Sequence, residues 1–144
     1  MGPNRVTFLV RGEDTGGRYS LTEFTLAPPP APGPPMHVHK AEEEAGYVLE
    51  GELDVTISER TTRATVGTFF LVPKGTLHTV ANPGPGPATA LFLLTPPGFE
   101  GYWEESAQLL EASGGDPDPE RMRALQEKYN VDMRGEVRRF SPEN

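Results

Sequence analysis

GPPMHVHKAEEEAGYVLEG, residues 33–51, is the stretch on which the interpretation of the whole chain depends. It contains His37 and His39, and in an extended strand side chains two residues apart leave the same face. The remaining histidine of the chain, His78, lies in a second stretch, GTLHTV at residues 75–80. Because neutral imidazoles suit a divalent metal better than an apolar core, the three histidines predict a metal site.

A carboxylate is available to complete this ligand set, because Glu42, Glu43 and Glu44 follow His39 closely. All three are carboxylates, so the residue types alone leave open which one takes part. The chain has no cysteine, which excludes thiolate ligands and disulfides. Any metal is therefore held by nitrogen and oxygen atoms.

Two motifs in these stretches resemble those of the cupin superfamily. The first comprises Gly33, His37, His39, Glu44 and Gly51, and the second comprises Gly67, Pro73, Gly75, His78 and Asn82. With its flanking strands the resemblance covers most of residues 1 to 100. It implies an all-β fold, the double-stranded β-helix or jelly-roll barrel. Asn82 precedes a proline, and we expect it to form a turn.

The resemblance also implies a ligand set. One divalent transition metal per chain (Fe, Mn, Ni, Cu, Co or Zn) is expected, held by His37, His39, Glu44 and His78. The six residues between Glu44 and Gly51 select Glu44 as the carboxylate ligand. Glu42 and Glu43 are then expected to be solvated.

The chain is long enough for one domain, and its 16 glycines and 16 prolines suit short strands joined by tight turns. We expect residues 1–100 to form the barrel and residues 101–144 to form a helical extension packed on it. Helical spacing and capping signals predict helices at Gly101–Ala112 and about Pro119–Tyr129. Residues from Val131 onward are polar and weakly patterned, and are expected to form a loose tail.

Two features near the predicted site have alternative interpretations. Gly46 lies two residues beyond Glu44, where a glycine either widens the pocket or marks a β-bulge. Phe99, Tyr102 and Trp103 either close the barrel mouth as an aromatic lid or belong to a helix packed against the outside. Aromatic stripes usually belong to a core, which favours the second interpretation.

The resemblance is strongest to small bacterial cupins related to quercetin 2,3-dioxygenase, through YVLEGE at residues 47–52 and TPPGFE at residues 95–100. It implies a mononuclear metal dioxygenase acting on a small hydroxylated aromatic substrate, flavonol-like or catechol-like. Glu44 would then act as both ligand and general base. The alternatives are a metal-dependent isomerase, decarboxylase or hydrolase without oxygen chemistry, and a non-catalytic cupin that binds a small molecule.

Charge and hydropathy bear on partners and location. The net charge of −8 argues against nucleic acid or an anionic membrane surface as a partner. The N-terminus lacks a signal pattern and no apolar run approaches 18 residues, so a cytoplasmic protein is expected. Small cupins commonly pair, and the apolar run Val6–Val10 suits an edge strand exchanged between subunits. A homodimer is therefore expected.

Overall fold

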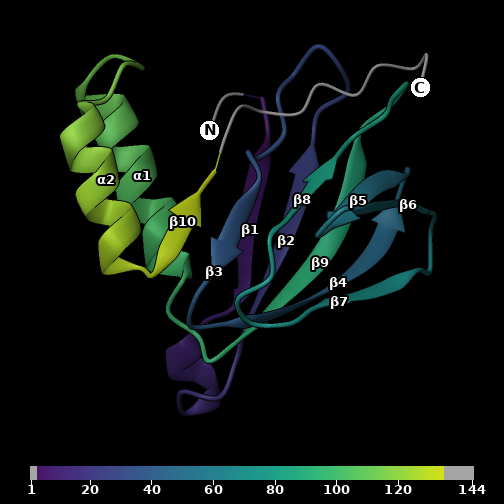
Figure 1. Ribbon diagram of the computed structural model, residues 1–144, viewed down its shortest axis with the longest axis horizontal. Helices are drawn as coiled ribbons and strands as arrows, with labels where there is room; N and C mark the ends of the chain where they lie inside the picture. The colour runs from purple at the N-terminus through teal and green to yellow at the C-terminus, as the bar shows by residue number, and fades with distance from the viewer. Residues whose placement is uncertain (1–2, 135–144) are drawn as a thin grey trace.

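Two antiparallel sheets of five strands each face one another in the computed structural model, which describes residues 3–134 (Figure 1). The first sheet has the order β1-β2-β9-β4-β7, and the second has the order β10-β3-β8-β5-β6. The strands are β1 Arg5–Val10, β2 Ser20–Leu26, β3 His37–His39, β4 Glu43–Glu50, β5 Leu53–Ile57, β6 Arg60–Ala64, β7 Phe69–Val72, β8 His78–Ala81, β9 Ala88–Thr95 and β10 Val131–Met133.

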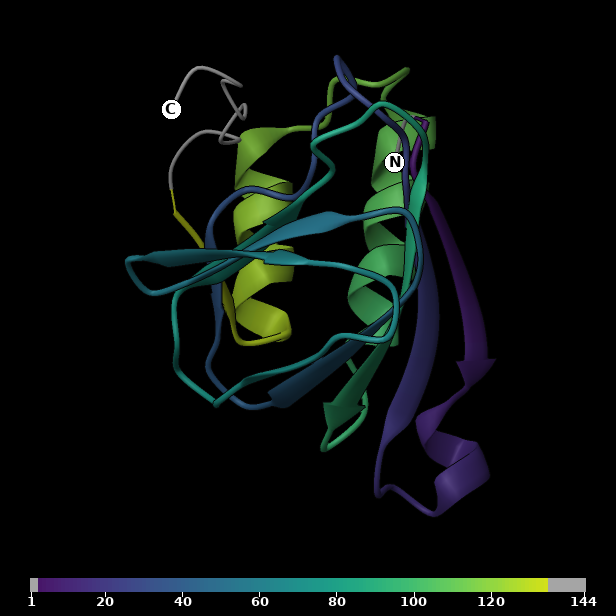
Figure 2. The same ribbon diagram turned by 90° about the vertical axis from the view of Figure 1, so that its right-hand side faces the viewer.

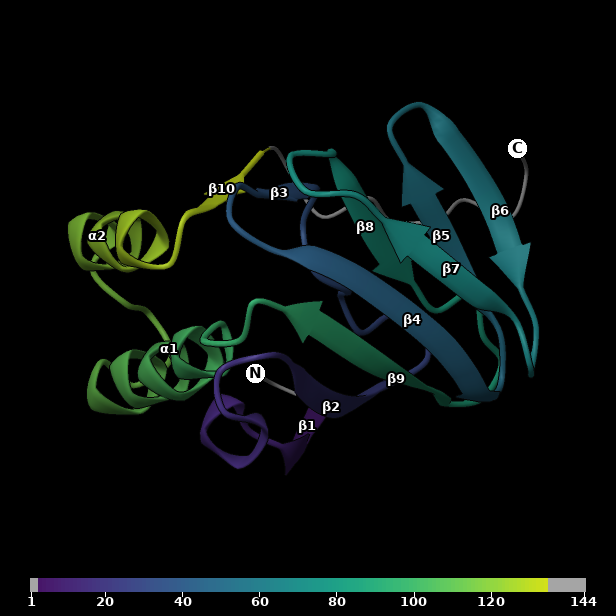
Figure 3. The same cartoon turned by 90° about the horizontal axis from the view of Figure 1, so that it is seen from below.

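The predicted all-β jelly-roll fold is confirmed, with one difference. Within residues 3–134, β6 and β7 end their respective sheets and do not hydrogen-bond to each other, so the two sheets remain separate instead of closing into a barrel. Figure 3 shows the two layers, with β4 and β9 on one side and β8 and β5 on the other. Figure 2 shows the short 3-10 helix η1, Gly12–Thr15, projecting from the end of the β1–β2 hairpin.

The core lies between the two sheets because alternate residues of each strand point inwards. On β4, Val48 is fully buried whereas its neighbours Tyr47 and Leu49 are exposed, which is the alternation expected of a sheet with one face against a core. Leu94 of the neighbouring strand β9 and Leu53 of β5 in the opposite sheet are also fully buried. Burying a side chain of this size contributes about 1.5–3 kcal/mol, so these positions hold the layers together.

Gly46 neither widens the pocket nor marks a bulge. Its pairing with β7 is regular, with Gly46 opposite Phe70, and the irregularity in β4 falls later, between Val48 and Glu50. The Phe70 ring lies directly over Gly46, in the space that a Cβ atom would occupy. The glycine therefore makes room for a cross-strand aromatic ring, an arrangement that pins register in designed sheets.

Asn82 forms the predicted turn and also ties two loops together. Its side-chain amide donates to the carbonyl of Leu26 at 3.0 Å and to that of Gly86 at 2.9 Å, and its carbonyl accepts from Gly84 N at 2.7 Å. The residue is buried. These bonds satisfy backbone groups of a proline-rich loop that cannot pair with a strand.

Both predicted helices are confirmed: α1 spans Glu100–Ala112 and α2 spans Pro119–Lys128. The Asp118 side chain caps α2 by accepting a hydrogen bond from Glu120 N at 2.9 Å, and Pro119 follows as the first helical residue. The two helices lie side by side at one end of the strands (Figure 1). No helix within residues 3–134 is long and apolar enough to cross a membrane.

The expectation of a loose tail from Val131 is wrong for the residues that the structure describes. After α2 the chain turns at Asn130, whose φ of 54° is left-handed, and β10 pairs antiparallel with β3. Val131 lies opposite His39, and Met133 lies opposite His37. Residues 135–144 of the expected tail lie outside the described residues. The division of the chain at residue 100 stays a prediction, and β10 shows that the C-terminal part contributes a strand to the second sheet.

The role of Gly46 can be tested by stability measurements. We expect Gly46→Ala to lower the free energy of unfolding by about 1–3 kcal/mol, because the new methyl group would overlap the Phe70 ring. Chemical denaturation followed by circular dichroism measures the change. In a Phe70→Ala background the same substitution should cost much less. Gly86→Ala is the matched control, since open space surrounds that position. Equal losses in both backgrounds would contradict this account.

The outer face of the first sheet bears on the expected homodimer, which stays a prediction. Tyr47 and Leu49 of β4, with Phe69 and Leu71 of β7, are between 40% and 62% exposed. β1 pairs with β2 of its own chain. An apolar sheet face of this kind is typical of a surface that packs against another molecule.

We expect light scattering to give a dimer of the 15.7 kDa chain at micromolar concentration. Tyr47→Lys combined with Phe69→Lys should yield a monomer, because charges brought together across a two-fold axis repel. Ala112→Lys, on the exposed side of α1, is the control and should leave the dimer intact. A monomeric wild-type protein would contradict the expectation.

Candidate metal centre

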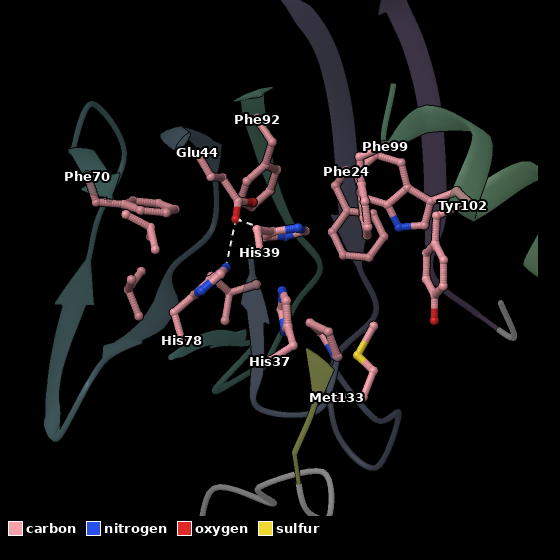
Figure 4. Close-up of a pocket in the computed structure, with 15 residues that line it drawn as sticks. Phe24, His37, His39, Glu44, Phe70, His78, Phe92, Phe99, Tyr102 and Met133 are labelled. Carbon is pink, nitrogen blue, oxygen red and sulfur yellow. Dashed lines mark hydrogen bonds and ion pairs between the residues drawn. The ribbon is translucent and has the colours of Figure 1, made fainter. Parts of the chain in front are cut away.

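Three strands bring the sequence-predicted ligands together. β3 and β8 are neighbours in the second sheet, with His37 directly opposite His78, and His39 follows two residues along on the same face. Glu44 reaches the group from β4 in the opposite sheet (Figure 4). One ligand atom from each of the four side chains lies within 4.8 Å of all the others, and all four residues are buried.

Two of the three histidine rings, those of His37 and His78, are held in a defined orientation by their outer nitrogens. His37 Nδ1 lies 2.7 Å from the carbonyl oxygen of Pro35, and His78 Nδ1 lies 2.8 Å from that of Thr76. A carbonyl can only accept, so each Nδ1 carries a proton and donates it. Each Nε2 is thereby directed to the interior, which is the usual arrangement around a metal-binding histidine.

The electrostatics of the group are dominated by burial and by Glu44. Burial lowers the pKa of His39 to about 4 and also lowers the pKa of His37, so both imidazoles are neutral at pH 7 and offer a lone pair. Burial also acts to lower the pKa of His78, but the hydrogen bond to Glu44, the charge of Glu44 and the hydrogen bond to Thr76 together outweigh burial, so the pKa of His78 is raised. The two atoms, His78 Nε2 and Glu44 Oε2, are 2.7 Å apart.

Glu44 is ionised in this environment. Burial alone would raise its pKa, yet the hydrogen bond from His78 and the neighbouring imidazoles lower it to about 2. Glu44 Oε2 also lies 3.5 Å from His39 Nε2. The interior of the protein thus contains a carboxylate facing three imidazole nitrogens, at a place where an unpaired charge would be costly.

Aromatic side chains surround the rest of a cavity of about 70 Å³ whose floor is this group. Phe70 lies on one side of the histidines, while Phe24, Phe99 and Tyr102 lie on the other (Figure 4). The remaining lining residues are Pro34, Val55, Val72, Val80, Phe92, Trp103 and Met133. The cavity is therefore mostly apolar, with its polar groups gathered at one point, as is common in small-molecule sites.

The favoured sequence interpretation of Phe99, Tyr102 and Trp103, a helix packed on the outside, is wrong. All three line the cavity. The Phe99 ring meets the His39 ring edge-on, with centroids 4.4 Å apart, and stacks on Tyr102 at 4.9 Å. The start of α1 therefore closes one end of the space between the sheets.

Glu42 also differs from expectation, whereas Glu43 is exposed as expected. The Glu42 side chain is buried, and burial raises its pKa to about 7. Its Oε2 lies 3.7 Å from His39 Nδ1, and neither atom has a hydrogen-bond partner. The sequence analysis grouped Glu42 with Glu43 as solvated, although alternation continued back from Glu44 places Glu42 on the same inner face.

The donor set fits a divalent transition metal. Three imidazole nitrogens and one carboxylate oxygen are ligands that Fe, Mn, Ni, Cu, Co and Zn all accept, so the residues do not choose among these metals. The orphaned Nδ1 of His39 is consistent with this fit, because a metal at Nε2 would fix that ring as a proton donor at Nδ1. The buried group could thus bind one metal ion.

The fold and the ligand group together define a class of protein. Residues 24–94 match the cupin domain family, and this range contains all four candidate ligands. The chain therefore contains a cupin domain. No curated protein sequence matches the chain significantly.

Solved structures support the same fold. The chain is similar to KdgF from Halomonas sp. (TM-score 0.60, 19% identity, covering 69% of this chain and 84% of that one). It is similar to a predicted oxalate decarboxylase from Thermotoga maritima (TM-score 0.57, 18% identity, covering 65% of this chain and 80% of that one). It is also similar to a sugar phosphate isomerase of the cupin superfamily from Silicibacter pomeroyi (TM-score 0.53, 25% identity, covering 62% of this chain and 59% of that one). The neighbours are diverse in activity, as expected of a fold that hosts many chemistries.

Removing a ligand should remove the metal without unfolding the protein. We expect His78→Ala to lose most of the metal found in the wild type, measured by elemental analysis of freshly purified protein, because the remaining three ligands hold the ion less tightly. Circular dichroism should show an unchanged fold, since the core is apolar. Glu43→Gln is the control and should keep full occupancy. Full occupancy in His78→Ala would contradict the ligand assignment.

Proposed function

We propose that the protein is a mononuclear metal dioxygenase acting on a small hydroxylated aromatic compound. The observation that carries this proposal is the position of the buried His37, His39, Glu44 and His78 group at the floor of a small cavity with aromatic walls. A substrate with hydroxyl groups on an aromatic ring matches both the polar floor and the aromatic walls of this cavity. Its oxygen atoms would face the polar floor, and its ring would contact the apolar walls.

The four ligand residues would hold the metal at this floor. A divalent metal in such a set polarises the oxygen atoms of a bound substrate and gives access to dioxygen chemistry. The protein contributes the surroundings: the aromatic walls exclude water, and the carbonyls of Pro35 and Thr76 fix two of the imidazoles. Pre-ordered groups of this kind need no rearrangement during reaction.

The volume of the cavity limits the substrate. About 70 Å³ is small beside the roughly 300–1,000 Å³ of typical ligand sites. A single ring of the catechol type suits this space better than a three-ring flavonol, which would require several aromatic side chains to move. Phe70, Phe99 and Trp103 are the walls that such movement would displace. Within the two substrate types expected from the sequence, the proposal therefore favours the catechol type.

Glu44 is proposed to act as general base. It is ionised, and its Oε2 lies among the three imidazoles where a substrate hydroxyl would be placed. A low pKa makes a carboxylate a weak base. However, the negative charge of a deprotonating hydroxyl competes with Glu44 for the surrounding positive charge, so Glu44 gains proton affinity as the hydroxyl loses it.

Two alternatives use the same residues. The first is a metal-dependent isomerase, decarboxylase or hydrolase, which needs no oxygen. The similarity to the sugar phosphate isomerase from Silicibacter pomeroyi supports this alternative. A non-catalytic cupin would bind a small molecule and release it unchanged. An oxygen-uptake assay on catechols and flavonols distinguishes these classes. The protein is loaded separately with Fe(II), Mn, Ni, Co, Cu and Zn for this assay.

With at least one of these metals, oxygen uptake on a catechol is the expected result, and ¹⁸O₂ should label the product with two oxygen atoms. Turnover of a substrate without oxygen uptake would favour the oxygen-independent enzymes. Binding by calorimetry with no turnover of any tested compound would favour the binding protein.

The base role of Glu44 predicts a separation between metal content and rate. We expect Glu44→Gln to retain part of the metal and to lose about 10²–10⁴-fold in turnover per bound metal, because the amide keeps one oxygen donor but cannot accept the proton. Steady-state oxygen uptake normalised by elemental analysis measures this. Glu43→Gln should leave the rate per metal unchanged. If metal and rate fell in proportion in Glu44→Gln, Glu44 would be a ligand only.

A further inference from the structure

Two polar atoms beside the metal centre are buried, unpartnered and close to each other. They are Nδ1 of His39 and Oε2 of Glu42, which lie 3.7 Å apart. The two residues are 4% and 7% exposed. Burying a polar group without a partner is costly, so two such groups side by side require an explanation.

The other two histidines show what His39 lacks. His37 and His78 each donate Nδ1–H to a backbone carbonyl, at 2.7 and 2.8 Å. His39 Nδ1 has no such partner among the described residues, and Glu42 Oε2 lies 3.7 Å from it. The separation of 3.7 Å exceeds a hydrogen bond by less than an ångström, which a small rotation of the Glu42 side chain would close.

We propose that Glu42 is a positioning residue of the metal centre: its carboxylate accepts a hydrogen bond from Nδ1–H of His39 and so holds His39 Nε2 towards the metal. Glu42 is not a metal ligand in this arrangement. It lies outside the cavity lining, in the loop between β3 and β4. A carboxylate behind an imidazole fixes its tautomer and strengthens it as a ligand.

The partner proposed for His39 differs chemically from the partners of the other two histidines. Pro35 and Thr76 offer neutral carbonyls, whereas Glu42 offers an acidic side chain to the ring that also contacts Phe99. A carboxylate partner compensates part of the charge that a divalent ion would bring into this apolar surrounding. This proposal rests on the metal centre of the proposed function and is independent of the reaction.

The test compares three variants by their affinity for Co(II), measured in competition with a chelator. Glu42→Met replaces the carboxylate by an apolar chain of similar length, Glu42→Gln keeps a weaker neutral acceptor, and Glu43→Met changes the exposed neighbour as a matched control. We expect Glu42→Met to weaken Co(II) binding about 10–100-fold. The loss in Glu42→Gln should be smaller but measurable, and Glu43→Met should bind like the wild type.

A second readout distinguishes positioning from a merely structural role. In Co(II)-loaded protein, the Nδ1–H of each bound imidazole gives a strongly shifted, exchangeable proton resonance. The wild type should show three, and in Glu42→Met only that of His39 should exchange rapidly with solvent or disappear. The metal-free Glu42→Met protein should be at least as stable to heat as the wild type, because it no longer buries an unpartnered carboxylate.

Wild-type affinity together with three unchanged resonances in Glu42→Met would overturn the proposal, and so would equal loss of all three resonances. If Glu42→Met does not fold, Glu42→Gln decides the matter, and unchanged affinity there overturns the proposal. Failure of the wild type to bind Co(II) would reject the metal centre itself. If the wild type binds Co(II) and Glu42→Met shows the same affinity and the same three resonances, only the role of Glu42 is rejected.

Discussion

The contact between Glu44 and His78 joins the two sheets at their centre, and the rest of the structure is arranged around it. Glu44 comes from β4 and His78 from β8, so the 2.7 Å contact spans the space that the core otherwise fills with apolar side chains. A buried carboxylate is tolerated only where donors or cations meet it. The placement of β3 beside β8 meets this requirement, because it brings His37 and His39 close to the Glu44 carboxylate.

The cavity follows from the same constraint. Strands that place ligands on their inner faces cannot also fill the interior with large aliphatic groups, and aromatic side chains from elsewhere surround the space instead. Phe70 reaches it over Gly46, and Phe99 reaches it from the start of α1. The polar floor is thus shielded from water by rings that belong to both ends of the molecule. Such shielding strengthens the electrostatic interactions inside it.

Much of the fold and the ligand group could be predicted from the sequence, because two of its motifs resemble those of cupins and because some features depend on local periodicity. The spacing of two between His37 and His39 determines their common face, and the capping residue Asp118 marks the start of α2. What could not be predicted depends on contacts between distant segments. Glu42 lies just before β4, and only the knowledge that the extended chain continues back from Glu44 distinguishes its buried carboxylate from the exposed one of Glu43. The ring of Phe70 fills the space beside Gly46 only because β7 pairs with β4.

The pairing of β10 with β3 has a consequence for the order in which the molecule can assemble. β3 is three residues long, and its neighbours are β8 on one side and β10, more than ninety residues further along the chain, on the other. Contacts between segments so distant in sequence form late, because the intervening chain must first be ordered. During synthesis the strand that carries His37 and His39 therefore keeps a free edge until residues 131–133 have emerged from the ribosome. A metal ion that binds during synthesis would therefore bind before β10 pairs with β3, whereas one that binds after synthesis would bind when this pairing is already complete.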